Sequence, residues 1–262
     1  MSLTIEQWEF AEKKRSAFAA SQTDASQLRA NVENIKRYLN PPADTVYPLE
    51  YAFSLLGDIS GKVVLEYGCG DGINTLMLAD RGAHVIALDL SLELLALARK
   101  RLEVNHRNAG VDFILGSAHN LPLPDESVDV VFGMAILHHL DLGLSSREVQ
   151  RVLRKGGRGI FEEPLRNSKL VKGMRKLIPS RAPDISPYER PLTDQELEAF
   201  GAGWQYRSKS FQLPTSRFIE SLPYLKKLND KLCPRVDASL LKTFPPLAYY
   251  SSVKVFEITK PS

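Results

Sequence analysis

The stretch 63–76, VVLEYGCGDGINTL, limits the fold of this chain more than any other. Its first residues are almost all apolar and predict a strand that is buried inside a sheet. Glycines follow at alternate positions, Gly68, Gly70 and Gly72, and residues 74–79 then begin a helix. A strand, a glycine turn and a helix in succession form a ligand crevice at the carboxyl edge of an open α/β sheet.

Two carboxylates at this turn favour a cationic ligand over a dinucleotide. Glu66 ends the strand and Asp71 lies inside the turn. A pyrophosphate needs backbone N–H groups without an anion nearby, so both acids would repel it. The spacing G-x-G-x-G also differs from the G-x-G-x-x-G of a dinucleotide turn. A ligand with an ammonium group and no phosphate, such as S-adenosylmethionine (SAM), fits better.

The run E-x-G-C-G-D-G followed by a helix closely resembles motif I of the class I SAM-dependent methyltransferases. The resemblance implies an α/β fold of Rossmann-like type, with seven mostly parallel strands, an antiparallel last strand and helices on both faces of the sheet. Its motifs cover about residues 57–163. The residues of the motif that it places at the cofactor are Glu66, Tyr67, Gly68, Cys69, Gly70, Asp71, Gly72 and Asn74.

A second strand, residues 84–91, ends in Asp89 and predicts a ribose contact. A βα unit puts Asp89 and the neighbouring Leu90 at the same carboxyl edge as Glu66. Asp89 can accept hydrogen bonds from two ribose hydroxyls, and it matches the ribose-binding acid of the family. Because NAD enzymes use an acid in the same way, Asp89 alone does not distinguish SAM from NAD.

The segment after the third strand, residues 111–116, resembles the adenine-binding segment of the family but departs from it at one position. The family has an acid after the glycine, and here that position holds Ser117. A hydroxyl can accept a hydrogen bond from the adenine amino group, but more weakly. Ala118 and His119 are expected to line the adenine pocket, although His119 equally suits a solvent-facing loop.

The fourth strand, residues 129–134, should end at the sulfonium and methyl group, which places Met134 and Ala135 there. His138 and His139 follow and resemble a histidine pair found just past this strand in the family. A histidine beside the methyl donor could accept a proton from the methyl acceptor. It could instead bond a neighbouring loop, and we expect that structural role for His138. No carboxylate or cysteine completes a metal-ligand set with them.

Four further residues are candidates for contact with the methyl acceptor. Glu162 and Glu163 end the fifth expected strand, residues 158–163, where a carboxylate could hold an amine or act as a base. Tyr47 and Tyr51 begin a helix before the first strand and could reach the mouth of the site. The structural alternatives are a loop ion pair for the acids and packing against the sheet for the tyrosines.

Outside the motifs, four further helices and strands are expected from glycines, a capping box and periodicity. Residues 145–154 are expected to form a helix that Lys155-Gly156-Gly157 closes, much as a similar turn does in the family. Residues 193–200 begin with a capping box, and 204–211 should form strand six. Residues 249–259 alternate with period two and should form the last strand.

The chain divides into an N-terminal helical extension, residues 1–45, and a methyltransferase domain, residues 46–262, with cap insertions at about 165–192 and 214–247. The extension either packs on the domain or covers the crevice as a lid. Its apolar residues recur at helical spacing and should face the domain. They are Trp8, Phe10, Phe18, Leu28, Val32, Ile35 and Leu39.

Residues 166–181 hold six lysines and arginines and no acid. An apolar stripe at helical spacing predicts a basic amphipathic helix, which we expect to cap the active site. Contact with an anionic membrane surface is the alternative.

Net charge, cysteine content and hydropathy limit the possible partners of the protein and its cellular compartment. The net charge of +3 does not indicate a nucleic-acid partner. The two cysteines, Cys69 and Cys233, suggest neither a disulfide framework nor a zinc site. The chain holds neither an apolar run of transmembrane length nor a signal-peptide core at its start, so we expect a cytoplasmic protein.

The resemblance implies methyl transfer from SAM to a small-molecule acceptor, with S-adenosylhomocysteine (SAH) as product and no metal. The segments around residues 121–131 and 138–140 look like the subfamily acting on quinones, sterols and secondary metabolites. Three alternatives stay open: a nucleic-acid or protein methyltransferase, a SAM-binding regulator without catalysis, and NAD-dependent oxidoreduction. Against a nucleic-acid methyltransferase, the fourth strand lacks the N-P-P-Y or D-P-P-Y turn that stacks a flipped base.

Overall fold

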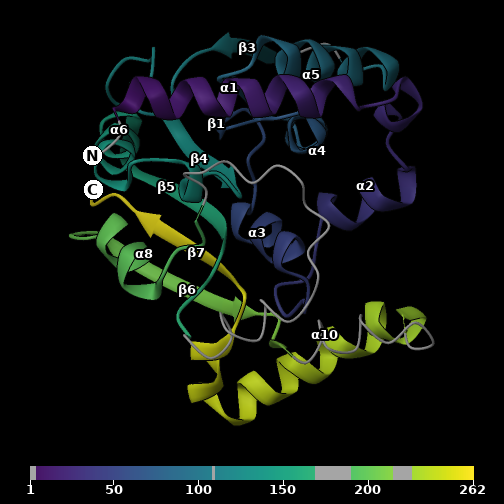
Figure 1. The fold of residues 1–262 in the computed structure, drawn as a ribbon, viewed down its shortest axis with the longest axis vertical. Helices are drawn as coiled ribbons and strands as arrows, with labels where there is room; N and C mark the ends of the chain where they lie inside the picture. The colour runs from purple at the N-terminus through teal and green to yellow at the C-terminus, as the bar shows by residue number, and fades with distance from the viewer. Residues whose placement is uncertain (1–3, 108–109, 169–189, 215–225) are drawn as a thin grey trace.

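The computed structural model describes residues 4–107, 110–168, 190–214 and 226–262 (Figure 1). Its centre is a seven-stranded sheet of order β3-β2-β1-β4-β5-β7-β6. Only β7 runs antiparallel to its neighbours, as expected. The strands are β1 Val63–Tyr67, β2 His84–Asp89, β3 Val111–Leu115, β4 Val128–Met134, β5 Leu153–Pro164, β6 Gln205–Phe211 and β7 Val253–Thr259.

Helices cover both faces of the sheet because strand residues alternate between two apolar clusters. Val64 of β1 packs with α3, α4 and α5, whereas Leu65 packs on the opposite face with α6 and α8. The expected two-sided architecture is therefore confirmed. These helices are α3 Pro48–Leu56, α4 Ile73–Asp80, α5 Leu92–Val104, α6 Leu142–Val152 and α8 Asp194–Phe200.

Side-chain caps start several of these helices where the sequence predicts them. Ser91 accepts from Leu94 N at the start of α5. Thr193 and Glu196 form the expected capping box of α8. Such caps satisfy N–H groups that have no partner inside the helix.

Two expected boundaries are wrong. Helix α6 ends at Val152 and β5 begins directly, so Gly156 and Gly157 lie inside the strand. The pairing of β4 with β5 shifts register at this point, and Gly156 has φ +71°. The glycines therefore form an irregularity in the strand and do not close a helix. Strand β7 also begins later than expected, because Pro245–Tyr250 forms a short 3-10 helix, η3.

The N-terminal extension forms α1 Ile5–Ser21, η1 Ala25–Leu28 and α2 Val32–Leu39, and Asp24 caps η1 where the helices are interrupted. In Figure 1, α1 crosses one end of the molecule beside α5, and α10 Lys226–Thr243 lies at the opposite end. Arg101 and Asn105 of α5 donate to the carbonyl of Leu28, which fixes η1 to the domain.

The face of α1 that meets the domain is not the apolar one. Phe10 and Phe18 are 71% and 54% exposed, whereas Glu12 and Ser16 are buried. The expectation of a buried apolar stripe on this helix is wrong for Phe10 and Phe18, whereas Trp8 lines a cavity beside Glu12 and Ser16.

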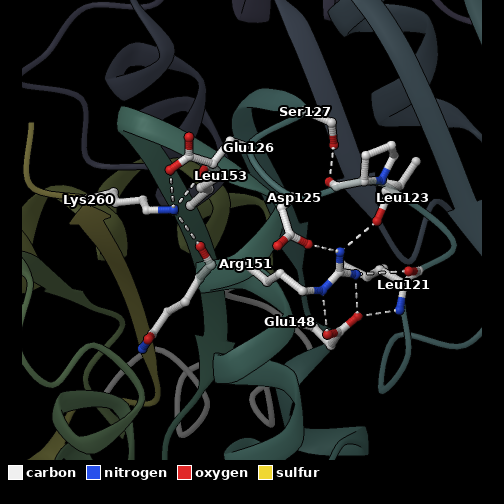
Figure 2. A network of polar contacts seen from close by, with 11 residues as sticks. Leu121, Leu123, Asp125, Glu126, Ser127, Glu148, Arg151, Leu153 and Lys260 are labelled. Carbon is white, nitrogen blue, oxygen red and sulfur yellow. Dashed lines mark hydrogen bonds and ion pairs between the residues drawn. The ribbon is translucent and has the colours of Figure 1, made fainter.

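An arginine of α6 orders the loop that follows the adenine segment (Figure 2). Arg151 donates to the carbonyls of Leu121 and Leu123, to Asp125 and to both carboxylate oxygens of Glu148. The bond from Arg151 lowers the pKa of Glu148, which in turn accepts from Leu121 N. The network holds the loop against α6.

The expected cap insertions fall largely outside the described residues. Of residues 166–181, only 166–168 are described, and the expected basic helix lies outside them. The second insertion is described from residue 226 onward, where α10 contacts β6 and η3. In the described part of the chain, no helix has the length and apolar character needed to cross a bilayer.

Candidate active site

A cavity of about 230 Å³ opens where β1, β2 and β4 end, with α1 as one of its walls. This is the edge at which an open α/β sheet binds ligands. Its lining residues are Trp8, Glu9, Glu12, Arg15, Ser16, Gly68, Gly70, Leu88, Asp89, Leu90, Leu94, Gly116, Ala118, His119, Met134, Ala135, Ile136, His139 and Leu140.

The glycine turn serves the cavity at one position and the packing of helices at another. Gly70 lines the cavity with φ +53°, and a Cβ there would meet no atom within 4 Å. Gly72 has φ +80°, and a Cβ there would lie 2.8 Å from the backbone Cα of Ala98. Gly70 thus leaves backbone open to a ligand, whereas Gly72 lets α4 and α5 approach closely.

Asp89 is fixed at the cavity wall by backbone donors. Its Oδ2 accepts from Gly70 N at 2.8 Å, and its Oδ1 accepts from Ser91 N at 2.9 Å. Burial raises the pKa of Asp89, while these bonds lower it. Each oxygen keeps a further acceptor position, so the carboxylate can still accept from two hydroxyls of a ligand.

Glu66 and Asp71 do not supply the free charges expected of them. Glu66 is 2% exposed and accepts a hydrogen bond from Thr75. Burial raises the pKa of Glu66 to about 8, so this side chain is largely protonated at pH 7. Asp71 pairs with the buried Arg101, with 2.5 Å between Oδ2 and Nη2. The charge argument is therefore wrong for these two acids, and the carboxylates at the cavity are Asp89 and those of α1.

Three further motif residues also lie outside the cavity lining. The Tyr67 hydroxyl donates to the carbonyl of Ala118, and burial raises its pKa. Cys69 is buried, which raises the pKa of its thiol. The Asn74 Oδ1 is buried without a hydrogen-bond partner among the described residues. The hydrogen bond from Tyr67 to the carbonyl of Ala118 thus holds the adenine segment in place.

The adenine segment meets the cavity through Gly116, Ala118 and His119, while Ser117 does not line it. The Ser117 Oγ accepts from His119 N at 3.0 Å and donates to Glu9 of α1.

The environment of His119 fixes its tautomer. Its Nε2 lies 2.9 Å from Asp141 N, a backbone donor, and must therefore accept. Its Nδ1 lies 3.0 Å from Glu9 Oε1 and consequently carries the proton that it donates. His119 is thus buried and neutral, and the solvent-facing alternative is wrong.

The two neighbouring histidines have different environments. The Nδ1 of His138 lies 2.7 Å from Glu163, which also accepts from the backbone N–H groups of residues 136–138. His138 and Glu163 therefore hold the turn after β4, in agreement with the structural alternatives. His139 lines the cavity, and its Nδ1 lies 3.4 Å from Glu12 Oε1.

Glu162 lies on the other face of β5 from Glu163 and pairs in register with Met134. Its Oε2 is buried without a hydrogen-bond partner among the described residues. Burial and the charge of Glu163 raise its pKa to about 7. Glu162 does not line the cavity, although its strand neighbour Met134 does.

Tyr47 and Tyr51 also stay outside the cavity lining. The guanidinium of Arg37 lies 5.0 Å from the Tyr47 ring. Tyr51 packs against Phe211 and lies 4.6 Å from the Lys209 ammonium. Packing on the sheet is the role that these contacts favour.

The lid alternative for the extension did not specify which residues of α1 would line the cavity; they are Trp8, Glu9, Glu12, Arg15 and Ser16. A signal was present, because Glu9 and Glu12 lie three residues apart and so share one helix face. Leu94, Ile136 and Leu140 were missed, since apolar residues near a turn carry no specific signal.

The strand order, the antiparallel β7 and the cavity beside the glycine turn define the class I methyltransferase fold. Residues 65–161 match a family model described as a methyltransferase domain. Phosphoethanolamine N-methyltransferase 1 of Haemonchus contortus, solved with SAH, shares the fold. Its TM-score is 0.62 at 17% identity, over 99% of this chain and 50% of that one.

Two curated relatives are similar in sequence. A fatty-acid O-methyltransferase of Mycolicibacterium smegmatis is 28% identical over 76% of this chain and 65% of the relative. A phthiotriol/phenolphthiotriol dimycocerosates methyltransferase of Mycobacterium tuberculosis is 42% identical over 38% of this chain and 37% of the relative. The chain thus spans less than two thirds of the length of either relative.

Proposed function

We propose that this protein transfers a methyl group from SAM to a small-molecule acceptor. One observation carries the proposal: Asp89, Gly70 and the end of β4 line a single cavity. A carboxylate with open acceptor positions suits a ribose diol, and bare glycine backbone suits a ligand lying close to the turn. Glu9 of α1 adds a carboxylate to the wall, which suits a cationic ligand, whereas Glu12 is paired with Arg15 of the same helix.

Three parts of the cavity would hold SAM. Asp89 would accept from the ribose hydroxyls, and Leu90 and Ala118 would flank the base. Gly68 and Gly70 would lie along the amino-acid part. We further propose that residues 1–45 serve as a lid on the domain formed by residues 46–262, since α1 lines the cavity and contacts α5.

SAM supplies an activated methyl group, and its leaving group is a neutral thioether. The protein therefore acts mainly by aligning the two reactants. We propose that His139 accepts the proton of an acceptor that must lose one. His139 lines the cavity, and its Nδ1 lies 3.4 Å from Glu12 Oε1, so we assign the accepting role to Nε2.

We propose an acceptor with an oxygen nucleophile, supported by the fatty-acid O-methyltransferase that resembles this chain over most of its length. We also propose that the reaction needs no metal and takes place in the cytoplasm. The neutral leaving group supports a reaction without a metal. The two buried free thiols, Cys69 and Cys233, support a reducing compartment.

Calorimetry with SAH and NAD tests the donor site. We expect SAH to bind and NAD to give no signal. Asp89→Ala should weaken SAH by about 1.5–3 kcal/mol, since it removes an ionised acceptor. Asp112→Asn, an exposed carboxylate on β3, is the matched control and should bind as the wild type does.

Transfer of a labelled methyl group to medium-chain fatty acids and phenols, in the presence of EDTA, tests the reaction. His139→Ala should slow turnover more than it weakens SAH binding. Binding of SAH without transfer to any oxygen acceptor would support the non-catalytic alternative, and absence of SAH binding would overturn the proposed function itself.

A further inference from the structure

The adenine side of the cavity lacks the acid that the resemblance leads one to expect, because Ser117 stands at that position. The structure brings a carboxylate to the same place from a distant part of the chain. Glu9 of α1 lies within hydrogen-bond distance of both Ser117 Oγ and His119 Nδ1. The two contacts join residues separated by more than 100 positions in sequence.

One oxygen of Glu9 is fixed and the other is open. Oε1 accepts from Ser117 and from His119 Nδ1, whose proton is held there by the bond between Nε2 and Asp141 N. Both donors thus meet the same carboxylate oxygen. Oε2 has no hydrogen-bond partner among the described residues, although Glu9 forms part of the cavity wall. The open oxygen is thus an acceptor at the edge of the cavity.

The surroundings of this oxygen favour a flat ligand edge that carries an amino group. Leu90, Leu94 and Ala118 line the cavity with apolar surface, and Trp8 adds an aromatic ring beside His119, with 6.2 Å between ring centroids. An adenine base joined to ribose at N9 can pack against such walls, and its only strong donor is the exocyclic 6-amino group.

We propose that Glu9 accepts a hydrogen bond from the 6-amino group of the adenine of SAM and thereby selects adenine as the base of the donor. The inference rests on the proposed function, because it assigns a further residue to the same donor site. Ser117 and His119 act as positioning residues that aim the Glu9 carboxylate. The donor site is then complete only when α1 is in place.

The test compares two ligands by calorimetry: SAH, and its analogue in which hydrogen replaces the 6-amino group. The wild type should prefer SAH by about tenfold or more, since an ionised acceptor loses its donor in the analogue. Glu9→Gln should abolish the preference. Ser117 and His119 both donate inward and so retain the amide oxygen, which leaves the amide NH₂ facing the ligand, where it cannot accept.

Glu6→Gln is the control, because Glu6 lies in the first turn of the same helix, is exposed, and loses the same charge. It should keep the preference for SAH. Equal weakening of both ligands by Glu9→Gln would show that Glu9 only fastens α1, and this would overturn the proposal. Failure of the wild type to bind either ligand would instead overturn the proposed function.

Discussion

Neighbouring carboxyl groups in this protein have opposite environments. Glu163 accepts from three backbone N–H groups and from His138, whereas Glu162, one position earlier, has a buried oxygen without a partner among the described residues. Burial of an acid without such donors favours its neutral form and raises its pKa, here to about 7.

Glu162→Gln should therefore change stability in a pH-dependent way. The pKa of Glu162 is higher in the folded chain than the ordinary value of 4.5, so the folded state binds more protons between about pH 4.5 and 7. Wild-type stability should fall as the pH rises through this window, and the glutamine variant should escape that loss. Urea unfolding at pH 5 and pH 8 should show a relative gain for the variant of up to about 3 kcal/mol at pH 8.

Glu163→Gln is the matched control on the adjacent residue. It should destabilise at both pH values, because an amide cannot accept all the bonds that the carboxylate accepts. A difference between wild type and Glu162→Gln that stays constant with pH would contradict the assigned environment of Glu162.

At the scale of elements, the strand-turn-helix unit was predictable because its signals are local. Apolar runs predict the strands, and the capping residues Ser91 and Thr193 mark the starts of α5 and α8. The orientation of α1 was not predictable from its apolar spacing, because a helix over a ligand cavity buries polar residues. The irregularity of β5 at Gly156 and Gly157 was also not predictable, since two glycines that follow a helix usually mark the end of that helix.

Substitutions of two glycines in one turn should separate folding from binding. Gly72→Ala should cost about 2–4 kcal/mol of stability, because φ is positive and the added Cβ meets the backbone of α5. Gly70→Ala should cost only about 1 kcal/mol, since its Cβ meets no atom, but should weaken SAH binding. Thermal unfolding and calorimetry measure the two effects. Equal losses of stability in both variants would contradict this division.

At the scale of the whole molecule, family resemblance predicted a seven-stranded, mostly parallel sheet with an antiparallel last strand. Five residues expected from the sequence near the cofactor line one cavity: Asp89, Ala118, His119, Met134 and His139. The sequence could not place the wall made by α1, because that contact joins residues far apart in the chain. The sequence also did not predict that Thr75 bonds Glu66 and that Arg101 pairs with Asp71. Local residue spacing does not show which side chains meet in the folded chain.

Because the cavity is built from both the extension and the domain, SAH should stabilise the two together. At a concentration 100 times its Kd, SAH adds about 2.7 kcal/mol to stability, which corresponds to a rise in Tm of roughly 5–10 °C. Cleavage by trypsin in the extension should slow in parallel. Asp89→Ala at the same SAH concentration should show smaller effects, and a rise in Tm without protection of the extension would show that α1 takes no part in binding.

Helix α1 lines the cavity with Glu9 and Glu12 and exposes Phe10 and Phe18 to water, so burial of its phenylalanines does not contribute to its attachment. Water can replace each of its polar partners at small net free energy. We expect the first helix to detach and return while both apolar clusters stay intact. Its departure would open the route by which fresh donor enters and spent product leaves.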